Sequence, residues 1–431
     1  MLQNPVHVVP HLALNKRVHS IPFLLDAYIL VYSKLLSKKW LKTAEELSSK
    51  SRAYRKFYNA MKSESTICTY SYCMVKFMEF LKSESHVNNI DEYDKLLDFD
   101  TEKITDVLED FVSYMNKTKK SKSITVFLGS AELFFEMNRK IWHKKLVRKS
   151  VKKDNAEPGG KTPITTEEAK MMLDSAKHPR DKALIHFLAS TGSRPAGILD
   201  PILRMKHLSY MPNPNNPIQE SKWCYAVRIY DESKEGYWSF LTPEATTALE
   251  RYFGWRKSIR HEEFNDETPV FSNFSNIAKL DYLEIHGMRQ IIGKHIINSN
   301  LKRVKKGHRY DKAQNYMFRK RFNGILKMDN EVNSNIAEKL MAHKRGLDGT
   351  YLQPTKEECY REFVKAIPQL TIDPTERQKI EIETKQQKID ELESKTTTID
   401  EQAKQIKELQ IQQEDQARLL RLIEKYPRMQ D

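Results

Sequence analysis

The strongest constraint on the fold is a break in the sequence pattern at residues 151–162. Within the expected first domain, residues 1–150, apolar side chains recur at intervals of three and four from about Pro22 to Leu146, the periodicity of amphipathic helices packed in a bundle. The break loses that periodicity and contains Pro158, Gly159 and Gly160, which are typical of a linker. We therefore expect a helical domain with an N-terminal extension, then a linker, then a second domain.

The length and charge of the chain set two further limits. At 431 residues the chain is long enough for two or three domains, each with its own core. Lysine and arginine total 72 against 58 acidic residues, and the formal charge is +14. Such a charge suits a polyanionic partner, and a merely soluble basic surface is the alternative.

Basic residues gather in several stretches of the helical domain. Each stretch alone is explained equally well by a solvated helix face, but several in one domain favour a surface that follows a phosphate backbone. The candidate binding residues are Lys117, Lys119, Lys120, Lys122, Lys144, Lys145, Arg148, Lys149, Lys152 and Lys153.

Cysteine usage and hydropathy exclude other classes of protein. The cysteines form no Cys-x-x-Cys pair and have no histidine nearby at metal-ligand spacing, so neither a disulfide framework nor a zinc site is indicated. The apolar run from Phe23 to Leu36 contains Asp26 and Ser33, and we interpret it as a buried helix rather than a membrane span. We expect an intracellular protein without a cofactor. The cysteines are Cys68, Cys73, Cys224 and Cys359.

The second domain is predicted to be helical around one β-hairpin. The capping box Thr165-Thr-Glu-Glu168 opens a helix, and a second helix over Asp181–Ser190 ends at Thr191-Gly192. Alternating β-branched and aromatic residues predict strands at Tyr225–Tyr230 and Tyr237–Leu241, joined by a turn near whose tip lies Lys234.

After the hairpin, the sequence predicts helices again. Thr242-Pro243 begins one of them, since proline suits the first turn of a helix. The remainder to about Leu370 is predicted helical, apart from a basic loop from Leu301 to Arg309. The expected fold class is therefore mainly α with a small β-hairpin sheet (α+β).

The tail, residues 373–431, is rich in Glu, Lys and Gln and has a heptad pattern. We prefer a weak coiled coil to a single solvated helix; if it pairs, it sets an oligomer or recruits a helical partner. Residues at a and d of one register are Ile389, Leu392, Ile399, Ala403, Ile406, Ala417 and Leu420, with Lys385, Thr396, Gln410 and Gln413 also in the seam.

Four segments carry the residue types needed to attack a phosphodiester without a metal. They are Thr-Gly-Ser-Arg194, Tyr316-Met-Phe-Arg319, Leu-Met-Ala-His343 and Tyr351. Two guanidiniums can grip the non-bridging oxygens of one phosphate, and a phenol can act as the nucleophile. Each residue alone has an ordinary structural explanation, but their joint order and spacing favour a site.

This ordered set, with the hairpin lysine, resembles the tyrosine recombinases, the phage-integrase type of site-specific recombinase. The resemblance covers roughly Thr162 to Thr371, and the basic helical region before it matches the position of that family's core-binding domain. It departs from the family at Tyr316, where His is usual, and at Ala342, where Gly is usual. A Tyr-x-x-Arg box resembles integrases of archaeal plasmids and viruses.

The resemblance implies an integrase-type catalytic domain over residues 163–372 and a role for each site residue. Tyr351 would attack the scissile phosphate to give a 3′-phosphotyrosine, and Arg194 and Arg319 would hold that phosphate. Lys234 would protonate the leaving 5′-oxygen. His343 and Tyr316 would donate hydrogen bonds to non-bridging oxygens.

Other residues of the right type remain as alternatives. Lys222 and Lys257 are weaker candidates for the general acid. His286-Gly-Met-Arg289 also spells His-x-x-Arg, but no Leu-x-Gly-His element follows it closely. We interpret it as part of a structural or DNA-facing helix.

The resemblance also implies partners. The expected partner is double-stranded DNA, with each site bound by a dimer and two sites brought together by a tetramer. The protein is expected to be cytoplasmic and nucleoid-associated, and to need neither metal nor nucleotide. Two other functions stay open. One is a DNA-binding or architectural protein that has lost the chemistry, and the other is a type IB topoisomerase.

Overall fold

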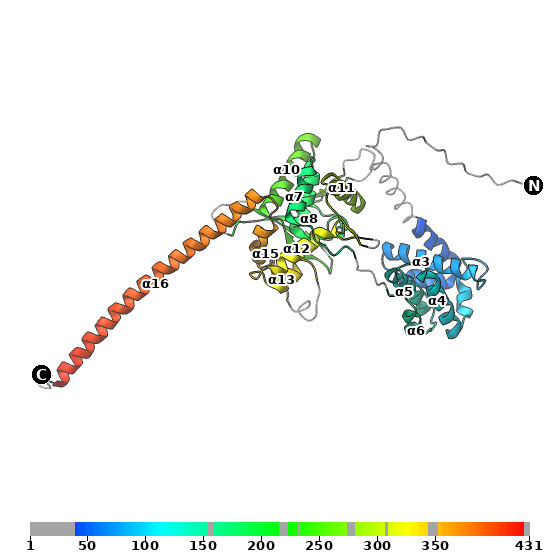
Figure 1. Ribbon diagram of the computed structural model, residues 1–431, viewed down its shortest axis with the longest axis horizontal. Helices are drawn as coiled ribbons and strands as arrows, with labels where there is room; N and C mark the ends of the chain where they lie inside the picture. The colour runs from blue at the N-terminus through cyan, green and yellow to red at the C-terminus, as the bar shows by residue number, and fades with distance from the viewer. Residues whose placement is uncertain are drawn as a thin grey trace, which may run out of the picture. The chain divides into compact units, whose positions relative to one another are not determined.

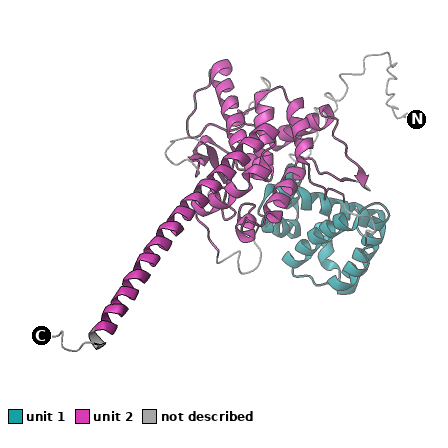
Figure 2. Ribbon diagram, turned by 60° about the vertical axis from the view of Figure 1, so that its left-hand side comes forward, with its two compact units in different colours: residues 1–156 teal, residues 157–431 magenta. Residues whose placement is uncertain are grey.

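The chain forms two compact units, residues 1–156 and residues 157–431 (Figure 2). The computed structural model describes residues 39–153, 159–214, 223–231, 233–273, 281–306, 309–343 and 352–425 (Figure 1). The boundary between the units falls inside the predicted linker, and the fold class, mainly α with small antiparallel sheets, is confirmed.

The first unit is a helical bundle, and three of its helices begin at polar caps. The side chains of Ser51, Ser63 and Asp100 each accept a hydrogen bond from a backbone N–H in the first turn of the helix that follows. Its core is rich in packed aromatic rings, among them Phe57 against Phe134. Its named helices are α2 (Arg52–Ala60), α3 (Glu64–Ser83), η1 (Tyr93–Asp98), α4 (Thr101–Asn116), α5 (Ser121–Met137) and α6 (Lys144–Lys149).

Two of the predicted basic residues in this unit are already paired. Lys144 and Arg148 lie 2.7 and 2.6 Å from the two carboxylate oxygens of Glu132 on α5, and Lys144 also contacts Glu136. Their charges are therefore partly compensated within the unit. The other candidates are exposed: Lys117, Lys119, Lys120, Lys122, Lys145, Lys149, Lys152 and Lys153.

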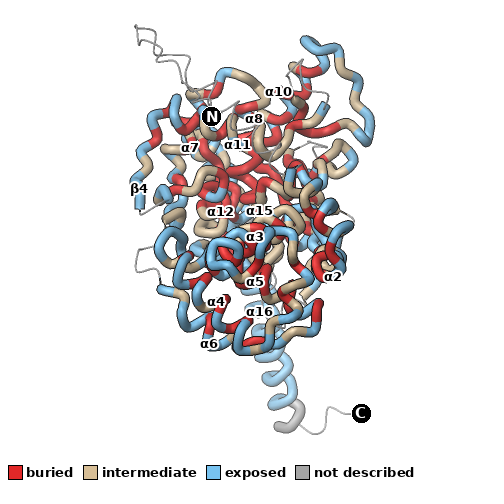
Figure 3. The backbone as a smooth tube through the Cα atoms, turned by 90° about the vertical axis from the view of Figure 1, so that its right-hand side faces the viewer, coloured by how far each residue is buried: buried red, intermediate tan, exposed pale blue. Residues whose placement is uncertain are grey.

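The second unit is built around α8 (Pro179–Thr191), whose side chains are mostly buried (Figure 3). The predicted capping box at Thr165 and Glu168 is present, and α8 ends at Gly192 as expected. The helices around α8 are α7 (Thr166–Ser175), α9 (Ala196–Leu199), η2 (Met205–His207), α10 (Pro243–Arg260), α11 (Ile285–Asn298), α12 (Tyr316–Met328), α13 (Ser334–Lys339) and α15 (Lys356–Leu370).

The predicted hairpin is present, and a third strand joins it. Strands β2 (Cys224–Ile229) and β3 (Tyr237–Phe240) pair antiparallel, with Ile229 opposite Tyr237. Strand β1 (Leu208–Met211) adds to the other edge of β2. Sequence reasoning missed β1 because four residues are too few to show a period, and its pairing is decided by β2.

Two other expectations for this unit were wrong. The segment predicted as a basic loop contains a short strand pair, β4 (Lys305–Lys306) with β5 (Arg309–Tyr310). The segment between α10 and α11 is not helical in its described residues, 261–273 and 281–284. There Pro269, which lacks an N–H for a helix, pairs through an isolated bridge with Arg204 instead.

The tail is one long helix, α16 (Pro374–Lys425). Asp373 caps it, accepting hydrogen bonds from the backbone N–H groups of Thr375 and Glu376. No helix in the described part of the chain is both long and apolar enough to cross a membrane. Among the same residues no group of His, Cys, Asp or Glu side chains is arranged to hold a metal ion, and none of the four cysteines is in a disulfide.

Candidate functional site: an arginine cluster at the end of α8

The loop that carries Arg194 is shaped by Gly192. This glycine ends α8 in the left-handed conformation, with φ 55° and ψ 19°, and its N–H donates to Leu188 O. A Cβ atom at this position would lie 2.7 Å from the ring of Phe322 on α12. Only glycine therefore suits both the backbone turn and the close approach of α12.

Arg319 ties this loop to two other segments. Its side chain is buried on α12, with 7% of its surface exposed. One terminal nitrogen donates to Gly192 O at 2.9 Å, and the other donates to Met341 O at 2.6 Å and to His343 Nε2 at 2.8 Å. Three of its five N–H donors thus have partners among the described residues, and the guanidinium is locked in place.

His343 is held on both sides of its ring. Its Nδ1 lies 2.5 Å from the Glu338 carboxylate, so the ring donates from Nδ1 and accepts from Arg319 at Nε2. Burial lowers the pKa of His343; Glu338 opposes this shift, while Arg319 and Arg194 add to it. The pKa lies below its ordinary value, and the imidazole is neutral at pH 7.

Ala342 explains how His343 is presented. Ala342 has a positive φ of 52°, and its N–H donates to Lys339 O while the N–H of His343 reaches back to Glu338 O. This left-handed turn closes α13 and turns the chain toward Arg319. Ala342 occupies the position where glycine would carry no steric cost.

The turn end of the β2–β3 hairpin, where Tyr230 and Tyr237 lie, is close to the arginines. Burial raises the pKa of Tyr237 to about 12, against the opposing positive charges of Arg319 and Arg194. Burial also raises the pKa of Tyr230, and again Arg194 and Arg319 oppose the shift. Both phenols therefore stay protonated, and both lie within electrostatic reach of the two guanidiniums.

The structure brings some of the predicted site residues together and leaves others apart. Arg194, Arg319 and His343 share one cluster. Tyr316, the first residue of α12, is 49% exposed and lies within electrostatic reach of Tyr230 and Arg319. Lys234 is exposed in the turn between β2 and β3.

The remaining candidates either lie outside the described residues or have other contacts. Tyr351 and Lys222 lie outside the described residues. The amine of Lys257 on α10 lies over the ring of Phe264. In the His-x-x-Arg sequence of α11, Arg289 is exposed and its carbonyl accepts from Gln314.

Sequence reasoning missed Glu338 and Tyr237. Glu338 precedes His343 by five residues, a spacing that does not place two side chains on one face of a helix, so the turn at Ala342 is needed to bring them together. Burial raises the pKa of Glu338, but hydrogen bonds from Lys327 and His343 outweigh it and the pKa lies below the ordinary value. Tyr237 carried no signal, because only the fold brings the start of β3 beside α12.

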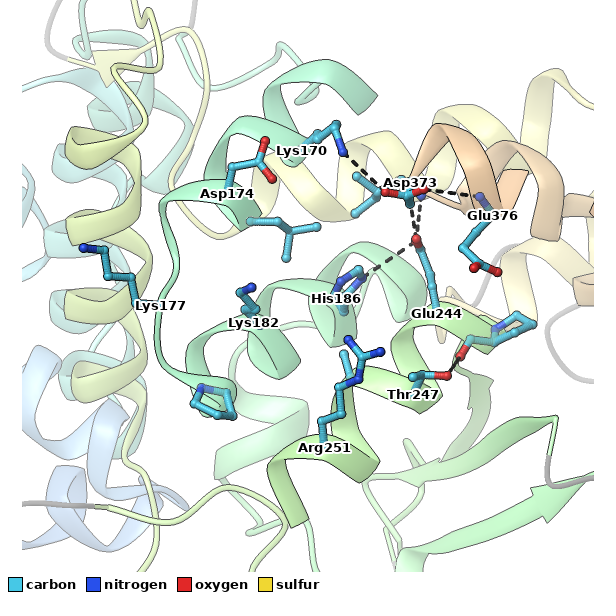
Figure 4. Close-up of a pocket in the computed structure, with 15 residues that line it drawn as sticks. Lys170, Asp174, Lys177, Lys182, His186, Glu244, Thr247, Arg251, Asp373 and Glu376 are labelled. Carbon is cyan, nitrogen blue, oxygen red and sulfur yellow. Dashed lines mark hydrogen bonds and ion pairs between the residues drawn. The ribbon is translucent and has the colours of Figure 1, made fainter. Parts of the chain in front are cut away.

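A cavity also lies elsewhere in this unit. It has a volume of about 550 Å³ and lies among α7, α8, α10 and the start of α16 (Figure 4). Figure 4 shows the His186 ring facing the Glu244 carboxylate, with 3.7 Å between Nδ1 and the nearer oxygen. None of the described site residues lines this cavity.

Solved structures similar to this chain are site-specific recombinases and integrases. XerH site-specific recombinase bound to a difH substrate shares 17% identity and covers 68% of this chain and 78% of that chain, with a TM-score of 0.46. XerA recombinase shares 16% identity over 74% of this chain and 96% of that chain, with a TM-score of 0.32. A lambda integrase tetramer bound to a Holliday junction shares 11% identity over 79% and 90%, with a TM-score of 0.40.

No protein-family profile matches the chain. No curated protein matches its sequence either.

Proposed function

We propose that the chain is a site-specific DNA recombinase of the tyrosine type, which cuts and rejoins duplex DNA through Tyr351. The observation that carries this proposal is the guanidinium of Arg319. It is buried, fixed by Gly192 O and Met341 O, and in contact with His343. Burying a cation at the meeting point of three segments costs free energy, which a phosphate bound there would offset.

The cluster has the electrostatics of a site for a dianionic transition state. Arg194 and Arg319 supply two positive charges in a partly desolvated setting, where they stabilise a pentavalent phosphorane better than in water. An entering phosphate oxygen would replace His343 Nε2 as a partner of Arg319. His343 would then take up a proton at Nε2, with Glu338 supporting the imidazolium, and donate to that oxygen.

In the cleavage step one P–O bond forms and one breaks. The phenol oxygen of Tyr351 attacks phosphorus, its proton leaves to a base, and the bond from phosphorus to the 5′-oxygen breaks. Lys234 in the hairpin turn gives its proton to that 5′-oxygen. Attack by a 5′-hydroxyl of another strand reverses the step, and no nucleotide is hydrolysed.

Several finer features belong to the same proposal. Tyr316 supplies a hydrogen bond in place of histidine, as in the archaeal integrases that this box resembles. The basic helical domain predicted over residues 1–150 binds the duplex, and the protein acts as a dimer on each site and a tetramer in synapsis. Binding should weaken steeply as salt rises.

The test is covalent capture on a nicked duplex. Sites would first be selected by the protein from a random-sequence pool, then nicked beside the candidate cleavage position so that the cut fragment diffuses away. A protein–DNA adduct in a denaturing gel that is lost in Tyr351→Phe supports the proposal. Selected sites that are bound tightly but never give an adduct would instead support the DNA-binding protein without chemistry.

A second variant tests the arginine cluster. Arg194→Ala should abolish the adduct, because one of two phosphate-gripping charges is lost, while gel-shift binding stays within about threefold, since most contacts to the duplex lie elsewhere. Binding lost in parallel with cleavage would count against placing Arg194 at the scissile phosphate. Relaxation of supercoiled plasmid without any selected site would favour the topoisomerase.

A further inference from the structure

The tail helix α16 carries an apolar seam that nothing within its own chain covers in the described residues. Every described side chain from Lys388 to Leu422 is exposed. The seam includes Ile389, Leu392 and Ile406, which are 47%, 56% and 56% exposed. These positions recur with the seven-residue spacing of a two-helix interface, not with the wider stripe of a helix that packs on a globular core.

The helix is too long and too weak in intrinsic propensity to be explained as a solvated rod. It has 52 residues, or roughly 78 Å at 1.5 Å per residue. Its middle contains Thr396, Thr397 and Thr398 in a row, and β-branched residues lower helix propensity. Most helices of this kind depend on packing of the apolar face.

The point at which α16 leaves the second unit is firmly held. Glu244 accepts the backbone N–H groups of Ile372 and Asp373 at 2.6 and 3.0 Å. Arg377, in the first turn of α16, donates to Thr371 O at 2.9 Å, and Ile372 is only 1% exposed. Because α16 is anchored in this way, pairing of two such helices would also hold together the two second units that carry the arginine clusters.

We propose that α16 pairs with α16 of a second copy of this chain as a parallel, in-register coiled coil. The charges beside the seam select this partner. Lys388 and Lys395 occupy g positions, and Glu393 and Asp400 occupy e positions. In a parallel pair each g residue faces the e residue five positions later on the partner helix, which sets Lys388 against Glu393 and Lys395 against Asp400.

An antiparallel pair fits the same charges badly. In an antiparallel pair each g position faces a g position of the partner, and each e position faces an e position. Lysines would then face lysines on one flank and acidic residues would face acidic residues on the other, so both flanks would be repulsive. Polar seam residues such as Thr396 and Gln410 weaken the pair but penalise shifted registers. Leu409, Ile411, Leu419 and Leu422 lie off the seam, so residues 388–406 define the register.

The decisive experiment reverses these charges in the full chain and measures mass by sedimentation equilibrium without DNA. The parent should be a dimer. The double variant Lys388→Glu/Lys395→Glu has acidic residues on both flanks of the seam, and Glu393→Lys/Asp400→Lys has basic residues on both. In a dimer of either variant four attractive pairs become repulsive, so its dissociation constant should rise at least roughly tenfold. Mixing the two variants should restore dimers.

Cysteine crosslinking tests the orientation. In a Cys68→Ser background, Leu392→Cys and Ile406→Cys at d positions should each form an interchain disulfide, because d faces d only in a parallel pair. Ser394→Cys, on the opposite face at f, is the control and should not. In an antiparallel pair a d position faces an a position of the partner helix. If a cysteine at a d position crosslinked only with a second copy that carries its cysteine at an a position, the pair would be antiparallel and the proposal would be overturned.

Other outcomes also decide it. A monomeric parent at micromolar concentrations, a trimer or tetramer mass, or variants that dimerise as well as the parent would each overturn the pairing. The inference does not rest on the chemistry proposed above, since it is measured without DNA. Adduct formation with the charge-reversal variants, measured separately, shows whether the recombinase proposal stands when pairing fails.

Discussion

The environment of His186 leads to a specific prediction for the pH dependence of stability. Burial lowers the pKa of His186 from 6.5 to about 4, and the cations Lys182 and Arg251 add to the shift while Asp373 opposes it. The side chain is 14% exposed, so solvent screens these effects little. Glu244, which faces it across 3.7 Å, has a raised pKa, chiefly through burial, and so does not supply a full negative charge as the pH falls.

The sign and size of the effect follow from proton linkage. Between pH 4 and pH 6.5 the imidazole of His186 binds a proton in the unfolded chain but not in the folded chain. The free energy of unfolding of the second unit is therefore at its full value above pH 6.5 and decreases as the pH falls toward 4. At pH 5 the loss relative to pH 7.5 is about 2 kcal/mol, given 1.36 kcal/mol per pKa unit. His186→Phe removes the titrating group and should lack this loss, while staying within about 1 kcal/mol of the parent at pH 7.5.

The assay must follow the second unit alone, because a chain of two units need not unfold in one step. Unfolding in urea can be monitored by hydrogen exchange of peptides from α8 and α10, which report on the second unit only. His143→Phe, which removes an exposed imidazole of the first unit, is the control and should behave as the parent does. If the stability difference between parent and His186→Phe were the same at pH 5 and pH 7.5, the burial argument would be refuted.

Three further predictions concern the turns and ring that shape the site. Gly192→Ala should destabilise the second unit by at least ~2 kcal/mol in urea titrations, since a Cβ meets Phe322 at 2.7 Å and the left-handed turn costs a further ~1 kcal/mol; an effect below 1 kcal/mol would contradict this. Ala342→Gly should stabilise it by about 0.5 kcal/mol, because relief of a left-handed alanine exceeds the added chain entropy; destabilisation would count against the strained turn. Glu338→Gln should slow adduct formation about tenfold and move the alkaline fall in rate to lower pH, since loss of the carboxylate weakens support for protonated His343; an unchanged pH profile would exclude that role.

Local features were predictable where a few neighbouring residues decide the outcome. The capping box at Thr165 and the end of α8 at Gly192 depend on hydrogen bonds within one turn, and both are present. The hairpin strands follow from alternation over a few residues. Strand β1 was not predictable, because its pairing partner lies in β2 and its own residues show no period.

The ordered residue types by themselves established that two arginines, a histidine and a tyrosine suited to phosphodiester chemistry follow the linker of a basic, mostly helical chain. The heptad spacing of the tail is likewise a property of sequence alone. Only the tertiary structure decided that Arg319 is buried against Gly192 and Met341, that Glu338 sets the tautomer of His343, and that the turn end of the hairpin lies beside the arginines. The reason is physical: helix caps and periodicity are local interactions, whereas the position and pKa of a buried side chain depend on burial and charges supplied by segments distant along the chain.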